Sequence, residues 1–227
     1  MVSENLEQVK ANIEAACKRV GRDPKDVRLV AVSKTKPISL IEEAIEAGQD
    51  TFGENKVQEM CDKMEVLPDN IKWHMIGHLQ RNKVKYIAGK VELIHSVDSI
   101  RLAKQISDEA QKQSIEIPVL LEVNVAREES KFGFFTVEEV LPLLEQISSF
   151  SHIQVKGLMT IAPFVENPEE NREVFKKLYE LAVDIQSKNI DNISMRELSM
   201  GMTGDYVVAV EEGATIVRVG TGIFGSR

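Results

Sequence analysis

The stretch Val27-Arg-Leu-Val-Ala-Val-Ser33 is a short, nearly continuous run of apolar residues, and Lys34 follows it directly. Such a run is typical of a strand that is covered on both faces, as in a parallel sheet. Further along, Ser39-Leu-Ile-Glu42 has the pattern of a capping box, in which the serine hydroxyl accepts from the amide of the glutamate. Gly48 then ends the predicted helix. The segment therefore predicts a strand followed by a helix.

The same alternation of strand and helix repeats along the chain. Further strands are predicted at 50–53, 72–76, 92–95, 119–125, 154–160, 197–199 and 215–219. Further helices are predicted at 54–65, 80–88, 99–113, 136–149, 168–188 and 204–212, and an additional helix at 5–20 precedes the first strand and ends at Gly21. Eight alternations in a chain of this length predict a (β/α)8 TIM barrel with an added N-terminal helix. A doubly wound open sheet is the competing architecture. No linker or repeat interrupts the pattern, so we expect one domain, residues 1–227.

Composition and charge limit the classes of function. The chain has 28 Lys and Arg against 36 Asp and Glu, a net charge of −8, which argues against a protein that coats nucleic acid or an anionic membrane. The first residues are acidic where a signal peptide is basic, and no apolar run approaches the roughly 18 residues of a membrane span. Cys17 and Cys61 are the only thiols. We therefore expect a reducing, cytoplasmic location, with Cys17 as a packed core thiol.

The functional positions of either architecture are the carboxyl ends of the strands and the loops after them. These segments are polar and glycine-rich, and they lie at 33–37, 53–55, 77–83, 95–98, 124–131, 159–160, 199–205 and 218–222. Glycines after the last two strands allow backbone amides to approach an anion, and Ser199, Thr203 and Thr221 add hydroxyl donors. The alternative is that these loops only make tight turns and cap helices. Both occur after adjacent strands, which favours a ligand that carries phosphate.

Lys34 ends an apolar strand, and a lysine that projects into a barrel mouth is partly desolvated, so its neutral amine can attack a carbonyl. Strand alternation places Lys36 on the same side, although it precedes a proline in the loop. The alternative for Lys34 is a packed stem with a solvated head. Arg218 also ends a strand and stands two residues before Gly220. A planar ligand with its phosphate on the Gly220 and Thr221 amides could therefore present a ring edge to the guanidinium.

Two other groups of residues carry weaker signals. His74, His78 and His95 could converge on a metal at the rims of the third and fourth strands, but hydrogen bonding at the rim is the favoured interpretation, and we expect no metal site. The basic run from Arg81 to Lys85 is read as a solvated helix face, with a phosphate or partner contact as the alternative.

Six segments of the chain together resemble the pyridoxal phosphate homeostasis protein family, single-domain relatives of the alanine racemase N-terminal barrel. The segments are Val32-Ser-Lys-Thr-Lys-Pro37, Phe52-Gly-Glu-Asn-Lys-Val-Gln-Glu59, Trp73-His-Met-Ile-Gly-His-Leu-Gln-Arg-Asn-Lys83, Gly157-Leu-Met159, Leu198-Ser-Met-Gly-Met202 and Val217-Arg-Val-Gly-Thr-Gly-Ile-Phe-Gly225. They span nearly the whole chain. The resemblance implies a cytoplasmic protein that controls the supply of pyridoxal 5'-phosphate.

The resemblance also implies a role for individual residues. Lys34 would hold the cofactor covalently as an aldimine, and Arg218 would face the pyridine nitrogen. Ser199, Gly220 and Thr221 would hold the phosphate, and Asn55 would lie beside the cofactor. The family usually has an acid where this chain has Val207, so the role of that acid is in doubt here.

A carrier and an enzyme are the two functions to separate. An amino-acid racemase needs a second acid–base group opposite the lysine, which racemases of this fold take as a tyrosine from a further C-terminal domain, and we expect no such domain after Arg227. Of the three tyrosines, only Tyr206 could approach the ligand. We therefore expect a monomeric binding protein with no catalytic residues, whose partners are pyridoxal phosphate and apo-enzymes that accept it. A racemase, or a barrel that binds another phosphorylated metabolite, are the alternatives.

Overall fold

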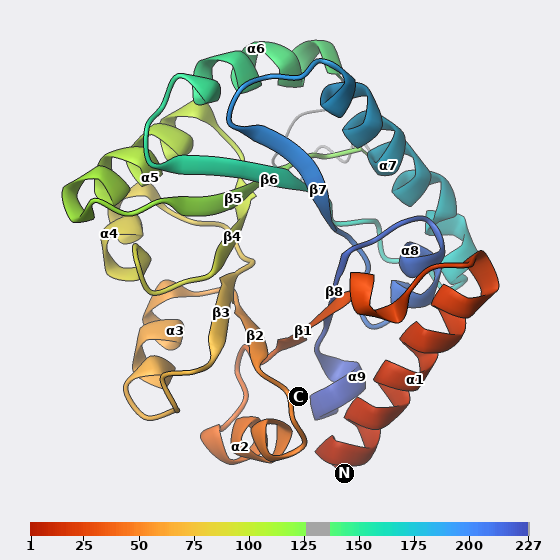
Figure 1. The fold of residues 1–227 in the computed structure, drawn as a ribbon. Coiled ribbons are helices and arrows are strands. Elements are labelled where there is room, and N and C mark those ends of the chain that lie inside the picture. The colour runs from red at the N-terminus through yellow and green to blue at the C-terminus, as the bar shows by residue number, and fades with distance from the viewer. Residues whose placement is uncertain (126–136, 227) are drawn as a thin grey trace.

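Eight parallel strands close into a barrel in the computed structural model, which describes residues 1–125 and 137–226 (Figure 1). The strands are β1 (Arg28–Val32), β2 (Thr51–Glu54), β3 (Lys72–Met75), β4 (Leu93–Val97), β5 (Ile117–Glu122), β6 (Ile153–Met159), β7 (Ile193–Ser199) and β8 (Ile216–Val219). Each strand pairs in parallel with its neighbours in chain order, and β8 pairs with β1. The predicted barrel is confirmed, and the open sheet is excluded.

Helices cover the outside of the barrel. The α-helices are α1 (Val2–Val20), α2 (Ile38–Glu46), α3 (Val57–Met64), α4 (Val84–Ile87), α5 (Ile100–Gln113), α6 (Val137–Ser148), α7 (Arg172–Ser187), α8 (Tyr206–Glu211) and α9 (Thr221–Phe224). Short 3-10 helices are η1 (Pro24–Asp26), η2 (Arg81–Lys83) and η3 (Pro168–Asn171). Of the predicted segments, residues 126–131 of the rim and Thr136 at the start of a helix lie outside the described residues. Among the described helices, none has the length and apolarity that crossing a membrane requires.

Of two predictions about helix ends, one is confirmed and one is wrong. Gly21 ends α1 at φ 70°, and the amide of the next residue donates to the Cys17 carbonyl at 2.9 Å, as expected for a glycine after a helix. The predicted capping box at Ser39 is wrong, because α2 begins at Ile38 with Pro37 at the N-cap and has no side-chain cap. Proline has no amide hydrogen to satisfy there, so the helix can begin one residue earlier and leave the serine inside its first turn.

The core has two parts. A small cluster of Val30, Leu93, Leu120, Met159 and Ile216 lies inside the barrel, and a much larger apolar cluster lies between the strands and the helices. The inner cluster fills only part of the barrel. The rest of the interior contains buried polar side chains, which form the site described below.

The added helix α1 packs against α8 and α9, beside the junction of β8 and β1 (Figure 1). Its buried face includes Leu6, Ile13 and Cys17, which belong to the same apolar cluster as residues of β1 and β8. The helix α9 that follows β8 has only four residues. We conclude that α1 covers the part of the barrel that a full eighth helix would cover. Cys17 is buried, as expected.

We predict that Leu6→Ala lowers the free energy of unfolding by about 2–5 kcal/mol, because the side chain is 1% exposed and its removal leaves a cavity under α1. Val20→Ala, at the 43% exposed end of the same helix, should change it by less than about 0.5 kcal/mol. Urea unfolding of both variants measures the difference. Equal effects would mean that α1 does not contribute to the core.

Candidate functional site

Lys34 and Lys36 follow β1, and the structure separates their roles. Val30 lies inside the barrel, so strand alternation directs Lys34 toward the barrel mouth. Its side chain is half-buried, and its amine has no hydrogen-bond or ion-pair partner among the described residues. The Lys36 amine instead donates to the Gly225 carbonyl at 2.8 Å and to two neighbouring carbonyls at longer distances. Lys34 is therefore the lysine whose amine is available at the mouth.

A buried ion pair lies directly behind this turn, between the barrel and α3. The Lys63 amine lies 2.7 Å from Glu54 Oε1 and donates to the Ser33 carbonyl at 2.8 Å. The Ser33 hydroxyl donates to the same Glu54 oxygen at 2.7 Å. Burial raises the pKa of the Glu54 carboxyl, although Lys63 and Ser33 oppose that shift. The residue immediately before Lys34 is thus held through both its backbone and its side chain.

The residue after Lys34 is held by the same cluster. Thr35 has φ 61°, a left-handed conformation that is unusual for threonine, and its amide donates to Glu59 Oε1 at 2.5 Å. Glu59 in turn lies 2.7 Å from the Lys63 amine. Burial disfavours the Glu59 carboxylate, but these two donors outweigh it and lower the pKa of the group. The turn that carries Lys34 is therefore fixed on both sides by α3 and β2.

A line of hydrogen bonds crosses the inside of the barrel. His74 Nδ1 lies 2.8 Å from His95 Nε2, and His95 Nδ1 lies 2.8 Å from Ser199 Oγ. Arg218 Nη1 donates to Ser199 Oγ at 2.5 Å, and Nη2 donates to the Thr160 carbonyl at 2.9 Å. All five residues are buried. The line connects β3, β4, β7 and β8 with the residue that follows β6.

Burial determines the charge of these groups. It lowers the pKa of His95 well below the ordinary value, and the His74 ring, Arg218 and Arg28 act in the same direction. Burial also lowers the pKa of His74, although the Glu92 carboxylate opposes that shift. Burial lowers the pKa of Arg218 to about 10, which leaves the guanidinium charged at neutral pH. The line therefore contains neutral histidines and one cation.

This arrangement corrects the prediction that all three histidines lie at the rim. His74 and His95 are fully buried inside the barrel, because they stand within β3 and β4 rather than after them. His78 does lie after its strand, with Nδ1 3.2 Å from Asp98 Oδ2. No group of three or more metal-ligating side chains occurs in the part of the chain that the structure describes.

The loops after β7 and β8 meet at Thr203. Its hydroxyl oxygen accepts from the amides of Gly220 and Gly222, each at 3.3 Å. Thr221 lies between these glycines with its side chain exposed. The loop after β7 is tied to β8 by the Arg218 amide, which donates to the Gly201 carbonyl at 3.0 Å. Backbone amides and hydroxyls therefore gather at one point beside the barrel mouth.

Asn55 follows β2 at the same end of the barrel and is half-buried. Its backbone lies against Gly77, where a Cβ atom would come within 2.5 Å of the Asn55 carbonyl oxygen. Asn55 also lines a cavity of about 280 Å³ together with His78 and Lys83. Lys83 belongs to the basic run at 81–85, which the structure places in η2 and α4, and it is the basic residue of that run that lines this cavity.

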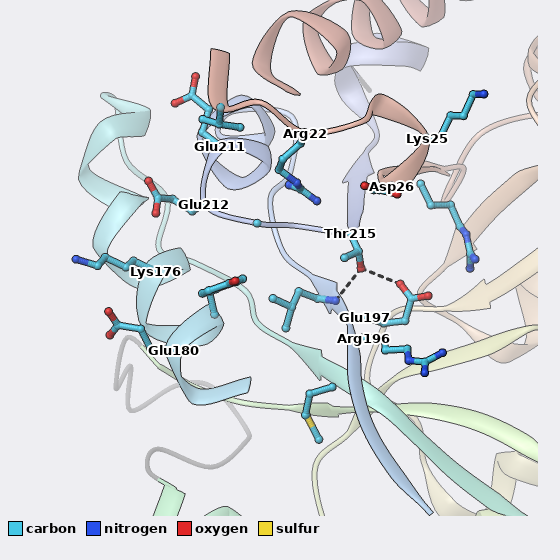
Figure 2. Close-up of a pocket in the computed structure, with 16 residues that line it drawn as sticks. Arg22, Lys25, Asp26, Lys176, Glu180, Arg196, Glu197, Glu211, Glu212 and Thr215 are labelled. Carbon is cyan, nitrogen blue, oxygen red and sulfur yellow. Dashed lines mark hydrogen bonds between the residues drawn. The ribbon is translucent and has the colours of Figure 1, made fainter. Parts of the chain in front are cut away.

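A cavity of about 940 Å³ lies near the amino ends of β1 and β8, away from these residues (Figure 2). Its Arg22 guanidinium donates to the carbonyls of Val210 and Ala214 at 2.6 and 2.9 Å. Figure 2 also shows Thr215 bonded to Glu197, at 2.7 Å. None of the predicted site residues lines this cavity, and these central polar groups already have partners.

Two residues that the sequence singled out beyond the phosphate loop lie outside the site. The Tyr206 hydroxyl accepts from the Asn12 amide of α1 at 2.8 Å, and the ring is buried on the outside of the barrel. Val207 is half-buried against the outer apolar cluster. The acid that the structure does bury nearby is Asp205, which accepts from Asn171 and from the amide of Met202.

Sequence reasoning missed the residues behind the site. Glu54, Lys63 and the inner positions of His74 and His95 were not assigned to it. A signal was present for the histidines, since each occupies an inward position in a strand that is otherwise mostly apolar.

Comparisons with known proteins identify the family of this chain. The family model for the alanine racemase N-terminal domain matches residues 5–227. The pyridoxal phosphate homeostasis protein of Aquifex aeolicus is 47% identical over 99% of this chain and 97% of its own length. The protein of the same name in Escherichia coli K12 is 37% identical over 100% and 97%. PipY of Synechococcus elongatus, in a structure with PLP bound, is 34% identical with a TM-score of 0.85, over 99% of this chain and 100% of PipY. With these matches over its whole length, the chain belongs to the pyridoxal phosphate homeostasis protein family, which is built on the alanine racemase N-terminal domain.

Proposed function

We propose that this protein binds pyridoxal 5'-phosphate at the carboxyl end of the barrel and serves its homeostasis in the cell. The observation that carries the proposal is the Lys34 amine, which has no partner among the described residues and lies at the same end as Arg218 and the Gly220 loop. The bound PLP of the PipY structure and the names of the relatives support it. The proposed functional unit is the whole chain, residues 1–227, as one domain.

Lys34 is the proposed point of covalent attachment. A neutral primary amine condenses with the aldehyde of pyridoxal phosphate to form a C=N bond, and the aldehyde oxygen leaves as water. The fixed turn around Lys34 limits where the amine can reach, because the residues on both sides of it are held by the Lys63 cluster. Lys36 is a poor alternative, since three carbonyls already accept from its amine.

The phosphate is proposed to lie at the loops after β7 and β8. The amides of Gly220 and Gly222 have only long hydrogen bonds to Thr203, so a stronger anionic acceptor can take them over. Thr203 and Thr221 then supply hydroxyl donors from either side. Ser199 was also predicted as a phosphate donor, but its hydroxyl already lies between Arg218 and His95. Ser199 is therefore better placed to hold the Arg218 guanidinium than to bind the phosphate.

The ring is proposed to lie between Asn55 and Arg218. The Arg218 guanidinium is charged and can only donate hydrogen bonds, so a pyridine nitrogen beside it accepts a bond and stays unprotonated. An unprotonated ring withdraws electrons less strongly, and this disfavours abstraction of an α-proton. The arrangement therefore favours storage of the cofactor over amino-acid chemistry.

Supply of the cofactor to apo-enzymes is the proposed physiological role, carried out by a cytoplasmic monomer. An amino-acid racemase needs a second acid–base group, and the Tyr206 hydroxyl is bonded to Asn12 away from the mouth. The other tyrosines, Tyr86 and Tyr179, are about half exposed on outer helices. Among the described residues, no tyrosine supports a racemase.

We predict that Lys34→Ala abolishes the borohydride-stable adduct with pyridoxal phosphate, whereas Lys36→Ala retains it. The reason is that, of these two lysines, only Lys34 has an amine without a hydrogen-bond partner among the described residues. Mass spectrometry of peptides after reduction identifies the modified residue. An adduct that maps to Lys36 and survives Lys34→Ala would refute the assignment.

Thr203→Ala should weaken the binding of pyridoxal phosphate about tenfold, because a hydrogen bond to a charged acceptor contributes about 1.5 kcal/mol. Thr203→Ser keeps the hydroxyl and should bind within about twofold of the wild type. Equilibrium dialysis of the three proteins gives the dissociation constants. Unchanged binding by Thr203→Ala would place the phosphate elsewhere.

The loaded protein should catalyse little or no exchange of the α-proton of alanine. Lys34 serves one face of a bound amino acid, and the Tyr206 hydroxyl is held by Asn12 on the outside of the barrel. Proton NMR in deuterium oxide reports the exchange directly, and Tyr206→Phe is the matched control, which should behave as the wild type does. Saturable exchange that disappears in Lys34→Ala would favour an enzyme.

A further inference from the structure

Ser199 is the residue whose sequence-based role and structural surroundings differ most. It was expected to donate to a phosphate, yet it is fully buried and its hydroxyl has partners on both sides inside the barrel. Its neighbours His95 and His74 are also fully buried, and the proposed binding of the cofactor makes no use of them. These three residues therefore need a separate explanation.

The direction of the hydrogen bonds can be derived from the chemistry of the groups. Arg218 can only donate, so the Ser199 oxygen accepts at that contact and has one hydrogen left to give. Each histidine is neutral, because burial disfavours its charged form, and so each ring carries a single N–H. The hydrogen bonds that join Ser199, His95 and His74 can therefore donate in only two ways, from Ser199 toward His74 or from His74 toward Ser199.

In the first direction, the Ser199 hydroxyl donates to His95 Nδ1 and His95 Nε2–H donates to His74 Nδ1. His74 Nε2–H then faces Glu92 Oε1 at 3.7 Å, a favourable contact with a carboxylate. His74 lowers the pKa of Glu92, which is also 3.1 Å from Arg28 Nη1. Every hydrogen along the line is directed at an acceptor or an anion.

In the reverse direction, His74 donates to His95 and His95 donates to Ser199. The Ser199 hydrogen then has no acceptor, since its recorded partners among the described residues are Arg218 and the donating His95. A bare lone pair on His74 Nε2 would also face the Glu92 carboxylate. A buried donor without a partner is costly, so this direction is disfavoured.

We propose that Ser199, His95 and His74 form one directional hydrogen-bond chain, whose direction the nearby Glu92 carboxylate favours and which positions the Arg218 guanidinium. In this chain the single hydrogen of Ser199 is committed to His95, so Ser199 acts on a bound cofactor only through Arg218. The proposal rests on the proposed function for its effect on pyridoxal phosphate. The hydrogen-bond chain itself is present in the protein without the cofactor.

The chain explains how Arg218 is held at a fixed orientation. Among the described residues, its side chain donates to the Ser199 hydroxyl at the end of β7 and to the Thr160 carbonyl just after β6. Hydrogen bonds that point the same way polarise one another, which makes the Ser199 oxygen a better acceptor for the guanidinium. The remaining N–H groups of Arg218 are then free to meet a ligand in a defined direction.

Nitrogen-15 NMR of the cofactor-free protein tests the chain directly. We expect two histidines to remain neutral with the hydrogen on Nε2 between pH 8 and 7, despite the charged groups around them, which are Glu92, Glu197, Arg28 and Arg218. His78→Gln and His152→Gln identify the signals of the other two histidines. Hydrogen on Nδ1 of either buried ring, or protonation in this range, would overturn the proposal.

The spectrum of bound pyridoxal phosphate tests the effect on Arg218. Ser199→Ala and His95→Gln should both give the bound cofactor an absorbance that changes with pH between 6 and 9, because the ring nitrogen can then take up a proton. The wild type should lack this change. Ser199→Thr, which keeps the hydroxyl, should restore wild-type behaviour.

Binding of inorganic phosphate separates the two roles of the loop residues. Ser199→Ala should leave the dissociation constant for phosphate within about twofold, whereas Thr203→Ala should raise it about tenfold. A loss in Ser199→Ala as large as that in Thr203→Ala, with an unchanged spectrum, would overturn the proposal. If the wild-type protein does not change the absorbance spectrum of pyridoxal phosphate, the proposed function fails, and the NMR experiment still decides whether the hydrogen-bond chain exists.

Discussion

The enclosed interior of the barrel is the constraint on which the site depends. Water cannot solvate a guanidinium inside closed strands, so the buried Arg218 depends on the Ser199 hydroxyl and the Thr160 carbonyl, which accept from it, and on the favourable charges of Asp205 and Glu122. The hydroxyl comes from the end of β7 and the carbonyl from the residue after β6, and the pairing of these neighbouring strands fixes their positions. The closed sheet therefore buries Arg218 and also positions the groups that accept its hydrogen bonds.

Lys34 is held in a different way, from outside the strands. The Lys63 cluster fixes the backbone on both sides of Lys34 and leaves the amine without a partner among the described residues. Arg218 is thus held by its side chain, and Lys34 by its backbone. A reactive amine needs its lone pair free, whereas a binding guanidinium needs a fixed orientation. The two modes of support match these two requirements.

The architecture could be predicted from the sequence because apolar strands and capped helices alternate with a regular spacing. The positions of Lys34 and Asn55 after a strand, and of Arg218 near the end of one, could be predicted for the same reason. The partners behind them were not found, because Glu54 and Lys63 come from different elements and meet only in the folded chain. The start of β7 was also missed, since the polar residues Ser194 and Arg196 interrupt its apolar pattern. A local sequence pattern predicts which face of a helix or strand is buried. It does not predict which side chains of different elements contact each other, and that requires the three-dimensional structure.

The position of α1 has a consequence for synthesis on the ribosome. Its apolar face packs beside the junction of β8 and β1 and against α8 and α9, which come from the other end of the chain (Figure 1). A growing chain therefore exposes Leu6 and Ile13 while every later strand is still being made. Contacts between such distant segments form slowly, because a long loop must close first. The barrel can close only after translation has passed β8, and until then α1 is a surface that chaperones can recognise.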